Sequence, residues 1–141
     1  MKRKAFAVWR GGLKDGKGTL STPDSGVLKD TPYSFSTRFE GAPGTNPEEL
    51  VGAALAGCFS MALSGQLEAA NLKAERIQTS ATVTMEKTDP GFTVTEVHLG
   101  VRAKVPGASQ EAFEKAANAA KTGCPISRLL NTNITMDARL L

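Results

Sequence analysis

A long stretch of apolar and small residues, from Leu50 to Leu67, constrains the fold of this chain more than any other feature. Asn46-Pro47-Glu48-Glu49 precedes it and is typical of a helix start, because asparagine caps a helix, proline suits its first position and acids favour its positive end. A helix that is apolar on every side is typically buried. Gly52, Gly57 and Gly65 each cost about 1 kcal/mol relative to alanine. We therefore expect another backbone, such as a partner helix, to approach closely.

The sequence on both sides of this helix alternates with the period of two that is typical of strands. The first forty residues predict a hairpin and a short third strand, and residues 77–86 and 97–105 predict a second hairpin. An apolar stripe over residues 113–120 predicts a second helix, and residues 134–140 predict a final strand. This order predicts the α+β class, in a single domain over residues 1–141.

Composition excludes several functional classes. A formal charge of +3, from 17 basic and 14 acidic residues, is too small and scattered to indicate a nucleic-acid-binding surface. The apolar stretch after Met1-Lys2-Arg3-Lys4 is too short for a signal peptide. No later segment is expected to approach the ~20 apolar residues of a membrane span. We expect a cytoplasmic protein, in which two cysteines are either reactive thiols or inert core residues.

The two cysteines are the first candidates for chemistry. Cys58 lies in the middle of the apolar helix, where it is either a small buried side chain or a nucleophile. Cys124 precedes Pro125 at the start of a predicted helical turn, where backbone N–H groups lower a thiol pKa, although a capping cysteine without function is the alternative. Their separation of 66 positions excludes a CxxC redox motif.

Few other side chains could take part. His98 is the single histidine, which argues against a zinc site, and its place in the strand pattern puts it on the outer face, away from a cysteine partner. No metal and no cofactor are expected. A thiolate would instead need a cation such as Arg38, which could equally be a surface charge on a strand. Glu48 could owe its place to the helix dipole alone.

Three segments carry a resemblance to a known family. These are Gly44-Thr45-Asn46-Pro47-Glu48-Glu49-Leu50, the helix through Ala56-Gly57-Cys58-Phe59-Ser60-Met61-Ala62-Leu63, and Gly123-Cys124-Pro125-Ile126-Ser127. With them, the chain resembles the osmotically inducible protein C/organic hydroperoxide resistance (OsmC/Ohr) family over nearly its whole length. Trp9 and the segments 17–22 and 33–41 resemble the OsmC branch.

The resemblance implies a peroxidase that reduces organic hydroperoxides in oxidative or osmotic stress. Cys58 matches the peroxidatic position and Cys124 the resolving one, while Arg38 and Glu48 match the charged pair that activates the first thiolate. It also implies an intertwined homodimer with two long central helices packed together, inside an OsmC-like fold of strands, central helix, hairpin, second helix and final strand.

The implied chemistry gives a sulfenic acid at Cys58, a Cys58–Cys124 disulfide and an alcohol, and then needs a dithiol reductant such as a dihydrolipoyl group. We expect an apolar substrate pocket, for which the candidates are Phe35, Phe39, Phe59 and Met61. One rival hypothesis is a non-enzymatic stress protein that binds apolar ligands in a dimer groove. A general disulfide oxidoreductase is a further rival, which the cysteine spacing disfavours.

Overall fold

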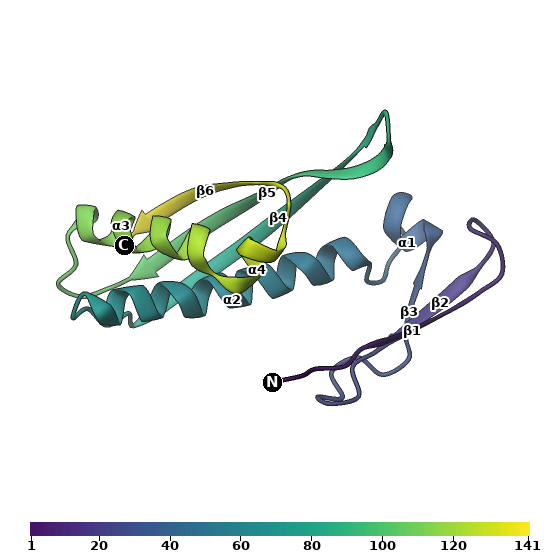
Figure 1. Cartoon of the computed structure of the whole chain (residues 1–141), viewed down its shortest axis with the longest axis horizontal. Coiled ribbons are helices and arrows are strands. Elements are labelled where there is room, and N and C mark those ends of the chain that lie inside the picture. The colour runs from purple at the N-terminus through teal and green to yellow at the C-terminus, as the bar shows by residue number, and fades with distance from the viewer. The chain divides into compact units, whose positions relative to one another are not determined.

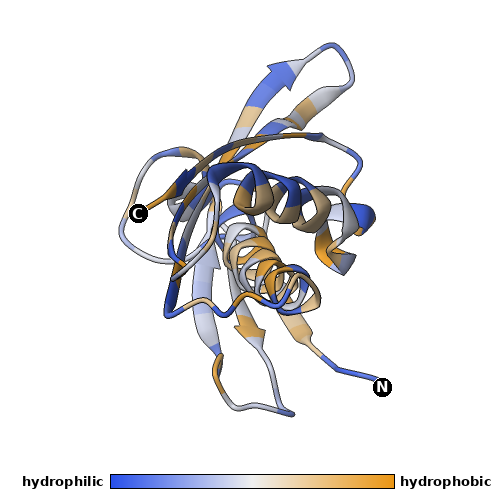
Figure 2. Cartoon of the chain, turned by 90° about the vertical axis from the view of Figure 1, so that its left-hand side faces the viewer, coloured by the Kyte–Doolittle hydropathy of each residue, from blue (hydrophilic) through white to orange (hydrophobic).

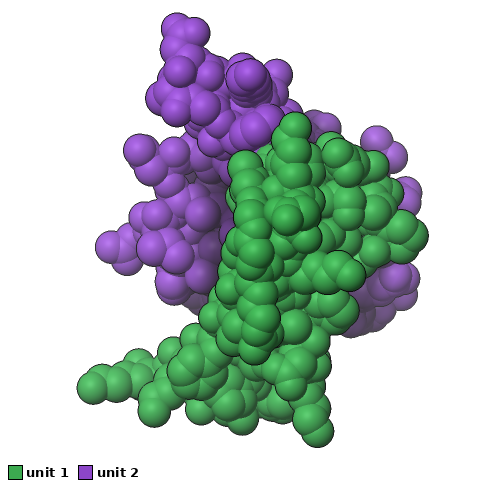
Figure 3. Space-filling view, turned by 90° about the vertical axis from the view of Figure 1, so that its right-hand side faces the viewer, with its two compact units in different colours: residues 1–50 green, residues 51–141 purple.

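The computed structural model describes residues 1–141 and divides them into two compact units, Met1–Leu50 and Val51–Leu141 (Figure 3). The expected single domain over 1–141 stays a prediction. The elements in chain order are β1 (Phe6–Arg10), β2 (Lys17–Ser21), β3 (Thr31–Ser34), α1 (Phe35–Phe39), α2 (Pro47–Ala69), β4 (Arg76–Thr88), β5 (Gly91–Lys104), α3 (Gln110–Gly123), α4 (Pro125–Leu129) and β6 (Asn133–Leu140) (Figure 1).

Unit 1 is a three-stranded antiparallel sheet in the order β1-β2-β3, as expected for a hairpin and a third strand. Helix α1 follows, so the view of Arg38 as a surface charge on a strand was wrong. Ser34 and Thr37 form a capping box at its start: the Thr37 N–H donates to the Ser34 hydroxyl at 3.3 Å, and the Ser34 N–H donates to the Thr37 hydroxyl at 2.9 Å. These contacts turn the aromatic stretch into a helix.

Unit 2 is built on the sheet β4-β5-β6. Strands β4 and β5 form the predicted antiparallel hairpin, and β6 lies parallel to β5. Helices α2 and α3 cover one face of this sheet (Figure 1) and share one apolar core with it. The predicted inner face of β5 is buried, namely Val97, Leu99, Val101 and Ala103, with Val105 just beyond the strand.

Helix α2 has two unlike faces, although most of it is apolar (Figure 2). Leu55, Phe59, Leu63 and Leu67 are fully buried. The opposite face is open: Met61 is 80% exposed, and Gly57 and Gly65 have no neighbouring atom where a Cβ would lie. The expectation of a helix buried all round therefore holds for one face within a single chain.

One expectation about α2 was wrong. By length and composition alone this helix could cross a membrane, whereas the sequence was expected to hold no such segment. Alanine and glycine keep its composition apolar although they bury little surface. A core helix of a soluble protein meets the same criterion, and the buried leucines of α2 pack against the sheet.

Candidate active site

The two cysteines meet in the core of unit 2. Cys58 lies in the middle of α2 and is half-buried, while Cys124 is the N-cap of α4 and is 1% exposed. Both are free thiols. Each thiol affects the pKa of the other, and the backbone N–H of Ile126 affects both, so the two side chains lie close together. Two residues 66 positions apart in the sequence are thus brought together in the core.

The surroundings act oppositely on the two thiols. Burial raises the pKa of Cys58, and the Cys124 side chain adds to this rise, against a lowering by the Ile126 N–H. Burial also raises the pKa of Cys124, but hydrogen bonds from the Ser127 hydroxyl and N–H, from Cys58 and from Ile126 outweigh it, so the net pKa is lowered. The lowering is in the predicted direction, and the Ser127 hydroxyl contributes more to it than either backbone N–H group of the helix start. The groups that act on Cys58 include no cation.

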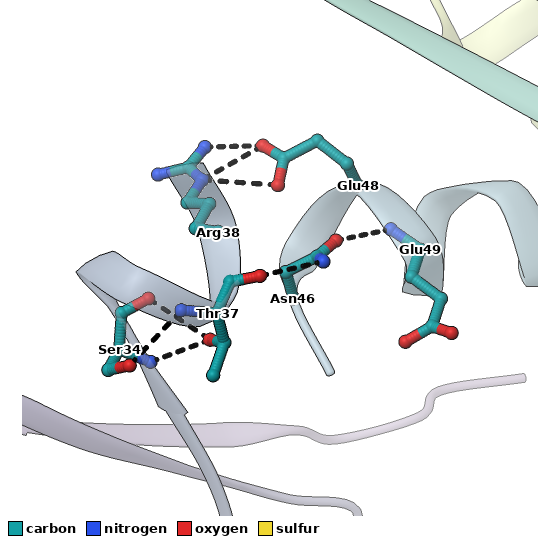
Figure 4. Close-up of polar contacts among 6 residues, drawn as sticks. All are labelled: Ser34, Thr37, Arg38, Asn46, Glu48 and Glu49. Carbon is teal, nitrogen blue, oxygen red and sulfur yellow. Dashed lines mark hydrogen bonds and ion pairs between the residues drawn. The ribbon is translucent and has the colours of Figure 1, made fainter. Parts of the chain in front are cut away.

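Arg38 and Glu48, the charged pair that the resemblance implied, form a bidentate pair in unit 1 (Figure 4). The Arg38 Nε lies 2.9 Å from Glu48 Oε1 and 3.1 Å from Oε2, and Nη2 lies 2.6 Å from Oε1. The side chains are 38% and 14% exposed, respectively. The hydrogen bonds that Arg38 donates to Glu48 raise the pKa of Arg38 and outweigh the lowering caused by partial burial. A guanidinium held in this way keeps one edge for another anion.

Local caps hold this pair in place. The side chain of Asn46 accepts the Glu49 N–H at 2.8 Å, which confirms the predicted N-cap of α2. The same side chain donates to the carbonyl oxygen of Thr37 at 3.2 Å, so Asn46 ties the start of α2 to α1 (Figure 4). Because Arg38 lies on α1 and Glu48 in the first turn of α2, this tie sets the spacing between them.

An apolar pocket of about 280 Å³ lies beside Arg38 in unit 1; it is lined by Trp9, Leu13, Tyr33, Ser34, Phe35, Arg38 and Phe39. Phe35 and Phe39, two of the expected pocket residues, have their ring centroids 4.8 Å apart. The sequence did not predict that Trp9, Leu13 and Tyr33 would line this pocket. Gly18 pairs with both Trp9 and Tyr33 in the sheet, and a Cβ there would overlap both rings.

The other two pocket candidates lie in unit 2. Phe59 is fully buried in the core, and Met61 is on the open face of α2. Their part in a pocket stays a prediction. His98 lies away from the cysteines, where its Nδ1 is 2.7 Å from the Thr135 hydroxyl and its Nε2 is 3.4 Å from Asp137. No group of three or more His, Cys, Asp or Glu residues could hold a metal ion.

Comparison with known proteins identifies the family. The profile described as "OsmC-like protein" matches residues 39–139. The chain belongs to the OsmC family. It is 49% identical to "Peroxiredoxin OsmC" of Escherichia coli over 98% of this chain and 96% of that protein, which places it on the OsmC branch of the OsmC/Ohr family, as the resemblance implied.

Solved structures of the family agree with the fold. The crystal structure of the organic hydroperoxide resistance protein OhrB of Bacillus subtilis matches with a TM-score of 0.68 and 26% identity, over 98% of each chain. An OsmC-like protein of unknown function from Vibrio cholerae matches with a TM-score of 0.77 and 18% identity, over 99% of each chain, and so supports the fold alone. The α+β OsmC-like fold is thereby confirmed.

Proposed function

We propose that this chain is a peroxidase that reduces organic hydroperoxides, with Cys58 as the attacking thiolate and Cys124 as the resolving thiol. The observation that carries the proposal is that the two cysteines of the chain, both free thiols, lie together in the core of unit 2. The names "Peroxiredoxin OsmC" of one relative and "Organic hydroperoxide resistance protein OhrB" of another support the activity and the substrate class.

Burial decides which cysteine meets the peroxide. Cys124 is almost completely buried, whereas Cys58 is partly accessible, so Cys58 is the better placed to attack an O–O bond. The attack releases an alcohol and leaves a sulfenic acid on Cys58, and condensation with Cys124 gives a disulfide and water. A dithiol then reduces this disulfide; we propose a compact one of the dihydrolipoyl type, since two exchange steps must occur at a half-buried sulfur.

The cation for Cys58 is proposed to be Arg38 of a second copy of the chain. Glu48 and Cys58 lie ten residues apart on α2, which is about 15 Å along a helix axis. Two copies of α2 that cross antiparallel on their open faces would bring the first turn of one toward the middle of the other. Gly57 and Gly65 leave room for that approach. In such a homodimer each site would combine Cys58 and Cys124 with Arg38 and Glu48 from the opposite subunit.

The pocket beside Arg38 is proposed to hold the organic part of the substrate. Its lining is mainly aromatic, and the Arg38 guanidinium lies 5.1 Å from the centre of the Phe39 ring. An alkyl or aryl group could bury apolar surface there while the peroxide oxygens meet the cation. Hydrogen peroxide has no such group, so we expect it to be the poorer substrate.

Thiol titration combined with peroxide consumption tests the function. Cys58 should react with an alkylating reagent near neutral pH and lose that reactivity after one equivalent of cumene hydroperoxide, and a dithiol should restore it. The rival hypothesis of a non-enzymatic protein that binds apolar ligands predicts thiols that react only in denaturant. That result, without peroxide consumption, would contradict the proposal.

A further inference from the structure

Ser127 is the one buried polar side chain, with 7% of its surface exposed, and it contacts a sulfur. Its hydroxyl oxygen lies 3.0 Å from Cys124 Sγ, and its backbone N–H donates to the same sulfur at 3.3 Å. A serine inside a helix often bonds the carbonyl of the preceding turn. Here the hydroxyl instead contacts the N-cap residue of its own helix.

Several groups favour the thiolate of Cys124. The Ser127 hydroxyl and N–H hydrogen-bond its sulfur, and together with the Cys58 thiol and the Ile126 N–H they lower the Cys124 pKa in spite of burial. The titratable group that faces Cys124 is Cys58, and no charged side chain acts on Cys124. Oxidation of Cys58 removes its S–H group. The contact of the Ser127 hydroxyl with Cys124 Sγ does not depend on that group.

We propose that Ser127 is a positioning residue for the second step of the reaction: its hydroxyl and backbone N–H hold the Cys124 sulfur in place and favour its thiolate while Cys58 is a sulfenic acid. This inference rests on the proposed function and adds a residue to it. The Cys124 thiolate attacks the Cys58 sulfur, the S–S bond forms, the S–O bond breaks, and hydroxide leaves and takes up a proton to become water. Cys124 is oxidised in this step, and the sulfenic sulfur is reduced.

Removal of the hydroxyl should affect the second step more than the first. In Ser127→Ala the Cys124 pKa should rise, so the pH midpoint of disulfide formation should move upward. Below that midpoint we expect disulfide formation to slow about threefold, because the smaller thiolate fraction is partly offset by the greater nucleophilicity of a more basic thiol. Over-oxidation of Cys58 by excess peroxide competes with this step and should rise by a similar factor.

Two measurements test the proposal. The first follows thiolate absorbance against pH in a Cys58→Ser background, with and without Ser127→Ala; it needs no peroxide and is therefore independent of the proposed function. The second compares alcohol release with disulfide formation after rapid mixing with cumene hydroperoxide. Ser127→Thr, which keeps a hydroxyl, should restore the wild-type pH profile.

Ser109→Ala is the matched control. Ser109 caps α3 by accepting the Ala112 N–H at 3.1 Å, so its loss weakens a helix start without touching a cysteine. Its pH profile should equal that of the wild type. An unchanged Cys124 titration in Ser127→Ala, or the same shift in Ser109→Ala, would overturn the proposal. Failure of the peroxidase itself would appear separately, as wild-type protein that releases no alcohol.

Discussion

The charged pair of unit 1 and the thiol pair of unit 2 are stabilised in opposite ways. Arg38 and Glu48 are partly exposed, and two short hydrogen bonds fix the guanidinium while its charge stays in contact with water. Cys58 and Cys124 are held in a core, where backbone and hydroxyl donors take the place of a cation. The first arrangement supplies positive charge and the second supplies reactive sulfur.

The difference shows what each pair lacks. The donors of unit 2 favour the thiolate of Cys124, the buried sulfur, whereas the pKa of Cys58 is raised. A Cys58 that attacks peroxide near neutral pH must therefore gain stabilisation from a further group. We propose that the pair of unit 1 provides it from the opposite subunit, because a guanidinium near a thiolate favours the charged form.

The largest expected effect separates the roles of the two sulfurs. Cys58→Ser should abolish consumption of cumene hydroperoxide, because the remaining thiol, Cys124, is buried and out of reach of the peroxide. Cys124→Ser should consume one equivalent per subunit and then stall or over-oxidise in the presence of a dithiol. Peroxide titration below and above one equivalent distinguishes the two variants. Loss of even the single turnover in Cys124→Ser would contradict its role as the resolving thiol.

Mixed dimers test whether the two pairs meet across subunits. Cys58→Ser and Glu48→Ala should each be nearly inactive as pure proteins. Refolded together, they should recover about a quarter of wild-type activity, because random pairing makes about half of the dimers mixed and each mixed dimer has one intact site. Differently tagged chains allow mixed dimers to be isolated and counted. If verified mixed dimers are no more active than the two single variants, Glu48 and Cys58 of one chain belong to the same site.

A smaller change tests the geometry of the cation rather than its charge. Arg38→Lys keeps the positive charge but loses the planar fork that holds Glu48. We expect the Cys58 pKa to rise, so that alkylation reaches its half-maximal rate at a higher pH and peroxide reduction near pH 7 falls about tenfold. Arg102→Lys, on an exposed strand position, is the control. If Arg38→Lys and the wild type have the same alkylation profile against pH, Arg38 does not stabilise the Cys58 thiolate.

Local signals explain what could be predicted from the sequence. Asn46 and Pro47 fixed the start of α2 because a cap and a first-turn proline act within a few residues. The α1 helix was missed because its capping box pairs Ser34 with Thr37 rather than with the usual Glu or Gln, inside an aromatic stretch that resembles a strand.

Long-range pairing explains what was missed. The contact of Trp9 with Tyr33 across Gly18 depends on the register of three strands, which alternation alone does not determine. The opposite pKa directions of the two thiols depend on donors that α4 brings to Cys124, and the position of Ser127 in the sequence does not reveal its contact.

The smallest expected effect concerns the open face of α2. The sign of the change in the free energy of unfolding shows whether a partner helix covers that face. On a helix exposed to water, Gly57→Ala and Gly65→Ala should each stabilise the fold by about 1 kcal/mol. Under a partner helix the added methyl groups would separate the two backbones, so we expect each change to lower the free energy of unfolding and to weaken dimerisation.

Gly52→Ala is the matched control for this last prediction. A Cβ at Gly52 would lie 3.4 Å from the Val83 side chain and 3.5 Å from the Ala81 carbonyl oxygen, both within unit 2. Its effect on stability should therefore not depend on protein concentration, whereas the effects at Gly57 and Gly65 should, because dimerisation is linked to folding by mass action. Denaturant unfolding at two concentrations gives the comparison. If Gly57→Ala and Gly65→Ala both stabilise the protein equally at each concentration, the open face of α2 carries no partner helix, and the cation for Cys58 must come from within the same chain.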